Sequence, residues 1–418
     1  MTSTALTLTR PRNAPWAHPA AFWPTLTAAT ADLDTPFGVL SVEALAANAF
    51  DLCDRARGLP IRVASKSVRV RGVLDAVLSL PGYRGILAYT LPEALWLAGG
   101  DTRYDDVVVG YPTVDRAALA QLASDAQLAS RVTLMIDDLA QLDLIDSVVS
   151  PQRRAAPIRL ALELDASYES AVLGHVGVRR SPVHTADAAK KLAAAIVARP
   201  GFRLVGMMGY EAQIAGVTNR GTGRATVIRR MQRASAAELA ERRGAAVSAV
   251  RELADLEFVN GGGTGSIETT RADPSVTEVA AGSGLFGPHL FDGYVQFRPA
   301  PAAAFSLSVV RRPTAAVATL LGGGWIASGP TASDRQPLPV WPEGLKTLPR
   351  EAAGEVQTPV TGDAARRLSV GDRVWLRHTK AGELSEHLSA FALVSIGENG
   401  GELVGELPTY RGEGKAFL

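Results

Sequence analysis

The chain has 418 residues, of which 47% are hydrophobic and 20% are charged, a composition typical of a globular protein with more than one domain. Its 43 basic and 42 acidic residues nearly balance, and no basic run is interleaved with aromatic residues, which disfavours nucleic acid as a partner. The single cysteine, Cys53, excludes an internal disulfide and a thiolate zinc cluster.

The N-terminal sequence, MTSTALTLTRPRNAPWAHPAAFWP, contains no long apolar segment after a basic start, so we expect no signal peptide. No apolar run approaches the roughly 20 residues of a membrane helix. We therefore expect a soluble cytoplasmic protein without a membrane partner. Cys53 lies in AANAFDLCDRARG, a helical pattern in which we expect a buried thiol.

Short apolar or β-branched runs alternate with Ala- and Leu-rich segments between residues 58 and 295. The runs predict strands at residues 60–65, 84–90, 106–110, 131–137, 158–165, 202–209, 256–261 and 277–282. The intervening segments, such as TLPEALWLAGG and TADAAKKLAAAIVAR, have the apolar spacing of helices. Eight strands, each followed by a helix, predict an α/β fold of the (β/α)8 TIM-barrel type, and a doubly wound open sheet is the main alternative.

After about residue 300 the predicted strands are short and are separated by Gly, Pro and polar turns, as in FSLSVVRR and GDRVWLRH. This pattern predicts a mostly β domain at residues 299–418, with a Pro-rich ordered loop at 329–349. We expect the barrel at residues 34–298, and an N-terminal segment, residues 1–33, that packs on the β domain.

Polar side chains follow several of the predicted barrel strands, at the edge where barrel enzymes have their active sites. The first strand ends at Lys66, in PIRVASKSVR. A lysine at a strand end most often extends into water, but an uncharged amine in apolar surroundings is a nucleophile. The fifth strand is followed by Arg179 and Arg180, and the sixth by Tyr210 and Glu211.

The last two predicted strands end in glycine-rich sequences, NGGGTGS at 260–266 and AAGSG at 280–284. Successive backbone N–H groups in Gly261 to Gly263 can point at one anion, and the hydroxyls of Thr264 and Ser266 can add to them. Such glycines also serve in tight turns, but two cradles on adjacent strands favour phosphate. A strand-end lysine together with a phosphate site indicates pyridoxal 5′-phosphate, whose aldehyde condenses with an amine.

These motifs resemble those of the fold-type III pyridoxal-phosphate enzymes, the alanine racemase-like barrels with a C-terminal β domain. Within them the sequence is most similar to the D-threonine aldolase and D-serine dehydratase branch. DTPFGVLSVEALAANA is similar to the family opening, RVASKS to its Schiff-base lysine motif, and VNGGGTGS and EVAAGSG to its phosphate-binding ends. Arg179 or Arg180, preferably Arg180, falls where the family has an arginine near the phenolic oxygen of the cofactor. The resemblance implies this set of cofactor-binding residues: Lys66, Arg180, Tyr210, Gly262, Gly263, Thr264, Gly282 and Ser283.

The chain departs from the family pattern at two places. Ala280 stands where alanine racemases have an arginine that faces the pyridine nitrogen. The aldolase and dehydratase branch binds a divalent metal through a His-x-Cys or His-x-Asp pair, and here His378 is followed by Lys380 at the second ligand position. Whether the chain binds a metal is therefore not decided by the sequence. His378 is the one candidate ligand that matches the family motif, and Glu383 and His387 could form another site with it.

The resemblance implies a pyridoxal-phosphate-dependent lyase for D-configured or 3-hydroxy amino acids, which acts by aldol cleavage or by β-elimination. Lys66, with His378 and Lys380, would be catalytic. One alternative is an amino-acid racemase whose two bases are Lys66 and Tyr410 of the partner subunit, and the other is a non-catalytic carrier of the cofactor. We expect an amino acid as substrate and a homodimer as the assembly.

Overall fold

The computed structural model describes residues 5–100, 104–330 and 332–418, and their contacts divide them into two compact units. The barrel unit consists of Leu52–Lys66, Pro81–Ala281 and Phe417–Leu418. The sheet unit consists of the described residues up to Asp51, of Ser67–Leu80 and of Gly282–Ala416. Among the described residues, no helix is both long enough and apolar enough to cross a membrane.

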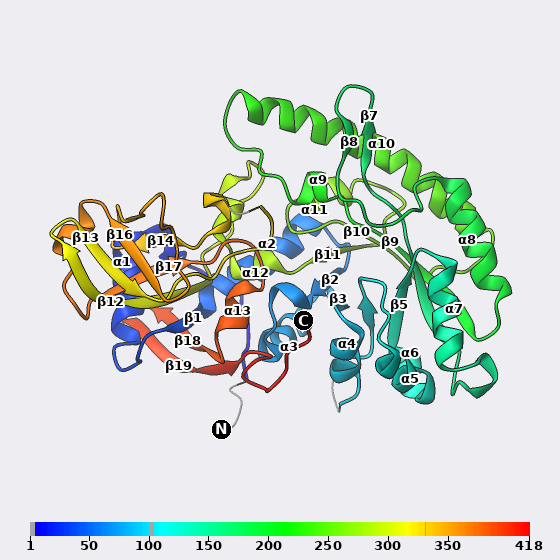
Figure 1. The fold of residues 1–418 in the computed structure, drawn as a ribbon, viewed down its shortest axis with the longest axis horizontal. Helices are drawn as coiled ribbons and strands as arrows, with labels where there is room; N and C mark the ends of the chain where they lie inside the picture. The colour runs from blue at the N-terminus through cyan, green and yellow to red at the C-terminus, as the bar shows by residue number, and fades with distance from the viewer. Residues whose placement is uncertain (1–4, 101–103, 331) are drawn as a thin grey trace. The chain divides into compact units, whose positions relative to one another are not determined.

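The barrel unit is built on a closed barrel of parallel strands (Figure 1). Around the barrel they are β2 (Ile61–Ala64), β3 (Tyr83–Ala88), β4 (Val107–Val109), β5 (Val132–Ile136), β6 (Ile158–Glu163), β9 (Phe202–Gly209), β10 (Phe258–Gly261) and β11 (Glu278–Ala281). Each lies within or beside one of the eight predicted runs, so the (β/α)8 prediction is confirmed and the open sheet is wrong. Side chains from several strands fill the barrel interior with a small apolar cluster that includes Val108, Met135 and Phe258.

Polar N-caps begin several of the barrel helices, where their side chains satisfy N–H groups of the first turn. Thr90, Asp115, Asp125 and Thr185 each accept a hydrogen bond from a backbone N–H in the first turn of the following helix, and Asp138 forms a capping box. The helices are α4 (Leu91–Ala98), α5 (Arg116–Ser124), α6 (Ala126–Arg131), α7 (Leu139–Val148), α8 (Ala186–Ala198), α9 (Ala212–Ala215), α10 (Arg224–Arg251) and α11 (Ile267–Thr270). A hairpin of β7 (Tyr168–Ser170) and β8 (Gly174–Val176) precedes α8, and α10 lies beside α8 (Figure 1).

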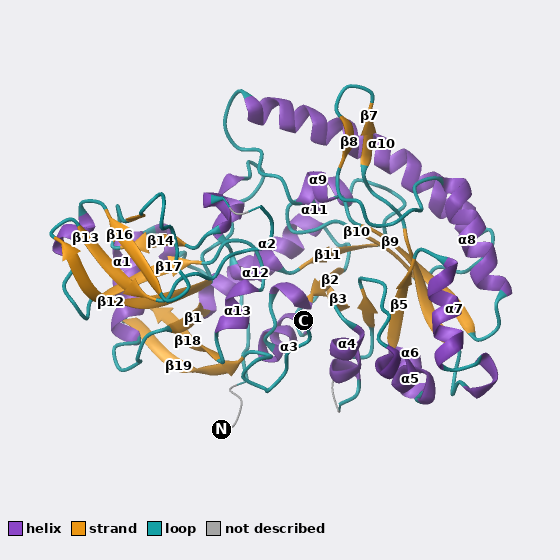
Figure 2. Ribbon diagram, viewed as in Figure 1, coloured by secondary structure: helices purple, strands orange, loops and turns teal. Residues whose placement is uncertain are grey.

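The sheet unit contains a nine-stranded sheet in which β1 (Phe37–Ser41) pairs antiparallel with β12 (Ala303–Thr314) and parallel with β18 (Ala390–Gly397). The other strands are β13 (Val317–Leu321), β14 (Leu338–Trp341), β15 (Lys346–Thr347), β16 (Gln357–Thr361), β17 (Arg373–Arg377) and β19 (Gly400–Pro408). After β12 the chain consists of strands joined by loops and short helical turns, which confirms the mostly β prediction (Figure 2). The Pro-rich segment that we expected to be a loop contains two strands, β14 and β15. Thr331 of this segment lies outside the described residues.

The helices of the sheet unit are mostly short. They are α1 (Pro19–Ala29), α3 (Arg71–Leu78), α12 (Ser283–Phe286) and α13 (Glu383–His387), with 3-10 turns η1 (Pro15–Ala17), η4 (His289–Gly293), η5 (Ser333–Arg335) and η6 (Ala364–Arg367). Helix α2 (Val42–Ala56) continues from the sheet unit into the barrel unit, which also holds the turn η3 (Pro151–Arg153). The bounds of the units differ from the expected barrel of residues 34–298, because β1 pairs in the sheet and residues 282–298 pack with it.

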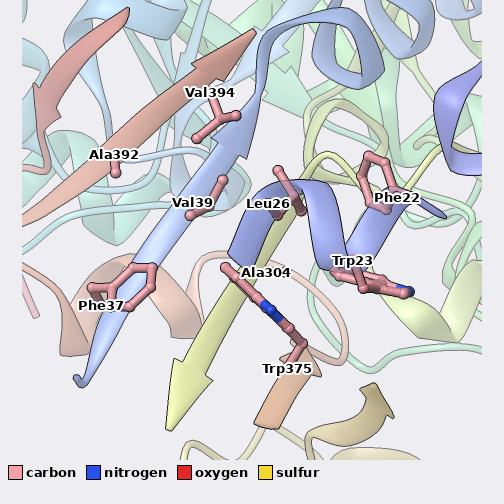
Figure 3. Packing of buried hydrophobic residues seen from close by; sticks show 9 residues of the cluster. All are labelled: Phe22, Trp23, Leu26, Phe37, Val39, Ala304, Trp375, Ala392 and Val394. Carbon is pink, nitrogen blue, oxygen red and sulfur yellow. The ribbon is translucent and has the colours of Figure 1, made fainter. Parts of the chain in front are cut away.

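An apolar core joins α1 to one face of the sheet (Figure 3). Phe22, Trp23 and Leu26 from α1 are buried against sheet residues that include Val39 and Trp375. The Trp375 indole N–H also donates to the Thr27 hydroxyl over 2.8 Å, so the large ring is packed and its polar atom is satisfied. The described part of the N-terminal segment is therefore an integral layer of the sheet unit.

Cys53 is half-buried, not buried as the helical pattern led us to expect. Its thiol donates to the Pro81 carbonyl oxygen over 3.6 Å. The thiol lies at the side of α2 that faces the Pro81–Gly82 turn, where solvent also reaches.

Candidate active site

Lys66 lies directly after β2, in the 3-10 turn η2 (Ser65–Ser67). Its side chain is half-buried, and its Nζ donates a hydrogen bond to the Tyr111 hydroxyl over 2.6 Å. Tyr111 follows β4 by two residues, so this pair joins the ends of two strands that are not neighbours in the barrel. The convergence follows from topology, since parallel barrel strands have their carboxyl ends at one edge.

A guanidinium group lies between two tyrosine rings at the same edge. The Arg180 guanidinium carbon is 5.7 Å from the centre of the Tyr111 ring and 5.2 Å from that of Tyr210, distances at which a cation is attracted to an aromatic face. Tyr210 directly follows β9. Lys66, Tyr111, Arg180 and Tyr210 therefore form one connected series of contacts, with Arg180 rather than Arg179 between the rings.

Two ionisable groups in this region have shifted pKa values. Glu163, the last residue of β6, is 3% exposed. Burial, together with the Asp137 carboxylate, raises the pKa of Glu163 to about 7, while Arg180 acts in the opposite direction. Burial also raises the pKa of Tyr210 to about 12, so that this phenol keeps its proton at neutral pH.

The glycine-rich loop after β10 lies against Tyr210. A Cβ atom added to Gly263 would lie 3.2 Å from a carbon of the Tyr210 ring and 3.2 Å from the Ala215 methyl group. Gly262 has a φ of +82°, a backbone conformation that residues other than glycine adopt only with strain. A Cβ atom added there would lie 2.7 Å from the Thr270 hydroxyl. The loop therefore approaches Tyr210 at Gly263 and Thr270 at Gly262 too closely for residues that carry side chains.

Two N–H groups of this loop donate to side chains of the protein, although we expected them to point toward a bound anion. The Gly262 N–H donates to Glu211 Oε2 over 2.9 Å, and the Gly263 N–H donates to Ser266 Oγ over 3.2 Å. The expectation that the N–H groups of these two glycines point at one external anion is therefore wrong for this conformation. Thr264 is 4% exposed, and its carbonyl oxygen accepts from Arg55 Nη2 over 2.6 Å.

Gly282 and Ser283 directly follow β11, which is the parallel neighbour of β10 in the barrel. Ser283 is the first residue of α12 and belongs to the sheet unit. Their part in a phosphate site stays a prediction.

The barrel residues fit pyridoxal phosphate. They offer a primary amine held by a phenol, a cation between two aromatic rings, and a glycine loop that lies directly against one of these rings. Lys66 would hold the aldehyde carbon, Arg180 and Tyr210 would adjoin the ring, and the loop 261–264 would receive the phosphate.

The residues expected at the metal, His378 and Lys380, follow β17 in the sheet unit. His378 is 1% exposed, and neither ring nitrogen makes a hydrogen bond within the described part of the chain. Burial lowers the pKa of His378 to about 4, so its imidazole is neutral near pH 7. Lys380 is half-buried, with its Nζ 3.4 Å from the Ser328 carbonyl oxygen.

The donor set around His378 does not fit a divalent metal. The Glu383 carboxylate already accepts the N–H groups of Thr379, Lys380 and Ala381 over 2.7 to 3.0 Å, so it is used as a turn cap. His387 stacks on the Trp325 ring at 5.1 Å. Within residues 5–100, 104–330 and 332–418, no group of three or more His, Cys, Asp or Glu side chains could hold a metal ion.

Comparison with known proteins identifies the family. The model of the alanine racemase N-terminal domain matches residues 40–289, more than half of the chain. The chain belongs to the alanine racemase N-terminal domain family. The match includes every residue of the connected series at the barrel mouth.

Individual relatives of known activity are similar to the chain at lower coverage. The chain is 25% identical over 268 residues to 3-hydroxy-D-aspartate aldolase of Paracoccus denitrificans (strain Pd 1222), and the alignment covers 61% of each chain. It is 29% identical over 279 residues to D-threonine aldolase of an Arthrobacter species, covering 64% of this chain and 66% of the relative. The matched segment thus spans about three fifths of the length of the first of these relatives, 61%.

Two solved structures share the fold over most of the chain. A D-threonine aldolase from Filomicrobium marinum superposes with a TM-score of 0.75 at 21% identity, covering 90% of this chain and 95% of that one. A D-threo-3-hydroxyaspartate dehydratase from Delftia sp. HT23 superposes with a TM-score of 0.68 at 20% identity, covering 90% and 98%. At these identities the superpositions establish the architecture, a parallel barrel with a mostly β second part.

Sequence reasoning missed Tyr111 and Glu163. Tyr111 lies one residue beyond the predicted strand 106–110, so a search of every strand end would have found it. Glu163 lies inside the predicted strand 158–165, where a carboxyl group in an apolar run is itself a signal.

Proposed function

We propose that the chain is a pyridoxal-phosphate-dependent lyase that cleaves or dehydrates D-configured 3-hydroxy amino acids. The observation that carries the proposal is the Lys66 amine, half-buried at a barrel strand end and hydrogen-bonded to Tyr111 in a series that continues to Arg180 and Tyr210. The relatives named above, two aldolases and a dehydratase of D-3-hydroxy amino acids, support the substrate class.

Pyridoxal phosphate, when bound, supplies an aldehyde that takes up an amine and a ring that withdraws electrons from it. Lys66 would hold this aldehyde, and its Nζ, when free as an amine, could accept or donate a proton. The Tyr111 hydroxyl, 2.6 Å from Nζ, orients the amine and can exchange a proton with it. Arg180 brings positive charge to the tyrosine pair, and the loop 261–264 would receive the phosphate.

Both candidate reactions need one proton to leave the substrate. In aldol cleavage a base removes the β-hydroxyl proton, the Cα–Cβ bond breaks to give an aldehyde, and Cα takes up a proton to give glycine. In dehydration the Cα proton is removed and the β-hydroxyl leaves as water, and hydrolysis then gives a 2-oxo acid and ammonia. Lys66 Nζ is the proposed proton carrier in either case.

We assign no step to a divalent metal, because the donors around His378 do not fit one. Lys380 stands at the second ligand position of the family motif, and we propose that its ammonium group binds the substrate hydroxyl or carboxylate in place of a metal. His378, which precedes Lys380 in sequence, is buried, so we give its imidazole no direct contact with the substrate.

The test is an assay of the purified protein, supplied with the cofactor, on both enantiomers of threonine and of 3-hydroxyaspartate. Glycine and an aldehyde from the D-enantiomers indicate an aldolase, and ammonia with a 2-oxo acid indicates a dehydratase. Loss of optical rotation without either product would favour the racemase, and cofactor binding without turnover would favour the carrier.

The racemase alternative depends on Tyr410. This residue is 1% exposed within its own chain, and its backbone N–H donates to the Arg69 carbonyl oxygen over 2.8 Å. A reach into the site of a second copy would require this packing to open, so we favour the lyase. The homodimer is proposed on the family resemblance, and light scattering at micromolar concentration tests it.

A further inference from the structure

Glu211 is a buried carboxylate that the proposed chemistry does not use. It directly follows Tyr210 and is 1% exposed. Its Oε2 accepts the Gly262 N–H over 2.9 Å and lies 3.2 Å from Arg243 Nη2, and its Oε1 accepts the Thr270 hydroxyl. One side chain after β9 thus binds the loop after β10 and the helix α11 that follows this loop.

Arg243 connects this carboxylate to a second one. It projects from α10, is 2% exposed, and its Nη1 lies 3.1 Å from the Asp273 carboxylate. Asp273 in turn accepts the Ser275 N–H over 2.9 Å and the Ser275 hydroxyl over 2.6 Å. Buried charges are tolerated when they are paired and hydrogen-bonded, so each member of this network depends on the others.

The network contacts the glycine loop at Gly262, whose N–H donates to Glu211. Gly262 has a positive φ of +82°. Gly263 then lies against the Tyr210 ring, where an added Cβ would be 3.2 Å away. Tyr210 and Glu211 therefore contact the loop from two sides, one through its ring and the other through its backbone.

We propose that Glu211 is a positioning residue that holds the loop 261–264 in its phosphate-binding shape, with Arg243 offsetting part of its charge. The inference rests on the proposed function, since the anion is the phosphate of pyridoxal phosphate. It assigns the Gly262 N–H to a protein carboxylate, and the face of the loop opposite Glu211 to the ligand.

The experiment compares two probes that differ only in the phosphate group, pyridoxal 5′-phosphate and pyridoxal. Each is titrated into the cofactor-free full-length protein, and binding is followed by absorbance and by borohydride trapping at Lys66. The variants are Glu211→Ala, Glu211→Gln and the surface control Glu252→Ala, which removes an exposed carboxylate paired with Lys190. We expect Glu211→Ala to weaken pyridoxal 5′-phosphate by about tenfold or more, and pyridoxal by less than about twofold.

Glutamine should rescue the affinity to within about threefold, because its amide oxygen can still accept the Gly262 N–H. Equal weakening of both probes by Glu211→Ala, or a glutamine variant as weak as the alanine variant, would overturn the inference. If wild-type protein binds neither probe at Lys66, the proposed function fails first.

If Glu211→Ala does not fold, Thr270→Val tests the same idea with a smaller change. It removes one donor to Glu211 and leaves the ion pair with Arg243 in place. A selective loss of affinity for the phosphorylated probe of about threefold supports the inference, and an unchanged ratio of the two affinities contradicts it.

Discussion

The expected site residues of the barrel unit and of the sheet unit have different surroundings. In the barrel unit, Lys66, Arg180 and Tyr210 follow three different strands and are nevertheless linked through Tyr111. In the sheet unit, His378 and Lys380 are two residues apart, but one is enclosed and the other has its ammonium 3.4 Å from a carbonyl oxygen.

The difference shows when a sequence motif predicts a contact. All strands of a parallel barrel end at one edge, so residues at those ends converge whatever their separation in sequence. A loop after an antiparallel strand has no such constraint, and its hydrogen bonds decide where each side chain points. Here the Glu383 carboxylate accepts three backbone N–H groups, which leaves no free carboxylate oxygen to bind a metal beside the His378 nitrogen.

The largest expected effect is at Lys66. Lys66→Ala should lower lyase activity about a thousandfold or more, because the nucleophile and the proton carrier are lost together. Borohydride reduction of the cofactor-loaded protein, followed by peptide mass analysis, should locate the label on Lys66 in the wild type. Lys346→Ala, at an exposed lysine in β15, is the control. Label on Lys346 or Lys380 would contradict the assignment of the cofactor amine to the barrel unit.

The stability of the barrel unit should depend on pH through Glu163. Its folded-state pKa is raised from 4.5 to about 7, so between these pH values the folded protein holds a proton that the unfolded chain has released. The free energy of unfolding should therefore fall with rising pH in this window, by up to about 1.4 kcal/mol per pH unit from this group.

The glutamine side chain in Glu163→Gln cannot ionise, so the variant should lack this slope. Its free energy of unfolding should therefore rise relative to that of the wild type as the pH rises to about 7. Urea unfolding of the cofactor-free protein across this range measures it, with Glu252→Gln as the control. A slope that survives in Glu163→Gln would show that another group is responsible.

Removal of the Tyr111 hydroxyl tests the contact that connects the barrel series. Tyr111→Phe keeps the ring beside Arg180 and loses only the acceptor for Lys66, so we expect kcat to fall about 10- to 100-fold with a smaller change in KM. Steady-state kinetics with a D-3-hydroxy amino acid measures the effect, and Tyr168→Phe, in the β7–β8 hairpin, is the control. An unchanged kcat would mean that the hydrogen bond has no part in turnover.

The smallest expected effects concern the sheet unit. Exhaustive chelation should change wild-type activity by less than about twofold, while Lys380→Ala should lower it about tenfold through loss of a charged hydrogen bond. Activity that chelation abolishes and manganese or zinc restores, together with a fully active Lys380→Ala variant, would show that the metal has been kept elsewhere.

The barrel was predictable because its strands are continuous apolar runs and its helices begin at polar caps such as Asp138. The sheet was predictable only in outline. Strand β1 precedes the barrel in sequence but pairs between β12 and β18, a long-range choice that its own residues do not reveal. Strands β14 and β15 are four and two residues long, too short for a periodic signal.

In the site, residue type and strand end pointed to Lys66, to Arg179 or Arg180 and to Tyr210, and the family resemblance favoured Arg180; the structure joins Lys66, Arg180 and Tyr210 by contacts. The direction of the Gly262 N–H was not predictable, because it depends on Glu211 from another strand. Glycine content shows that a loop can bind an anion, whereas the partners of its N–H groups depend on tertiary packing.

The position of β1 has a consequence for dividing the gene. A protein fragment that contains only residues 299–418 would lack β1, the strand that pairs with both β12 and β18. Both of these strands would then expose backbone donors and acceptors along their apolar middle, and such open edges pair with one another between molecules. We therefore expect the fragment to accumulate as aggregate, and co-expression with a peptide that contains Phe37–Ser41 to restore some of it to solution.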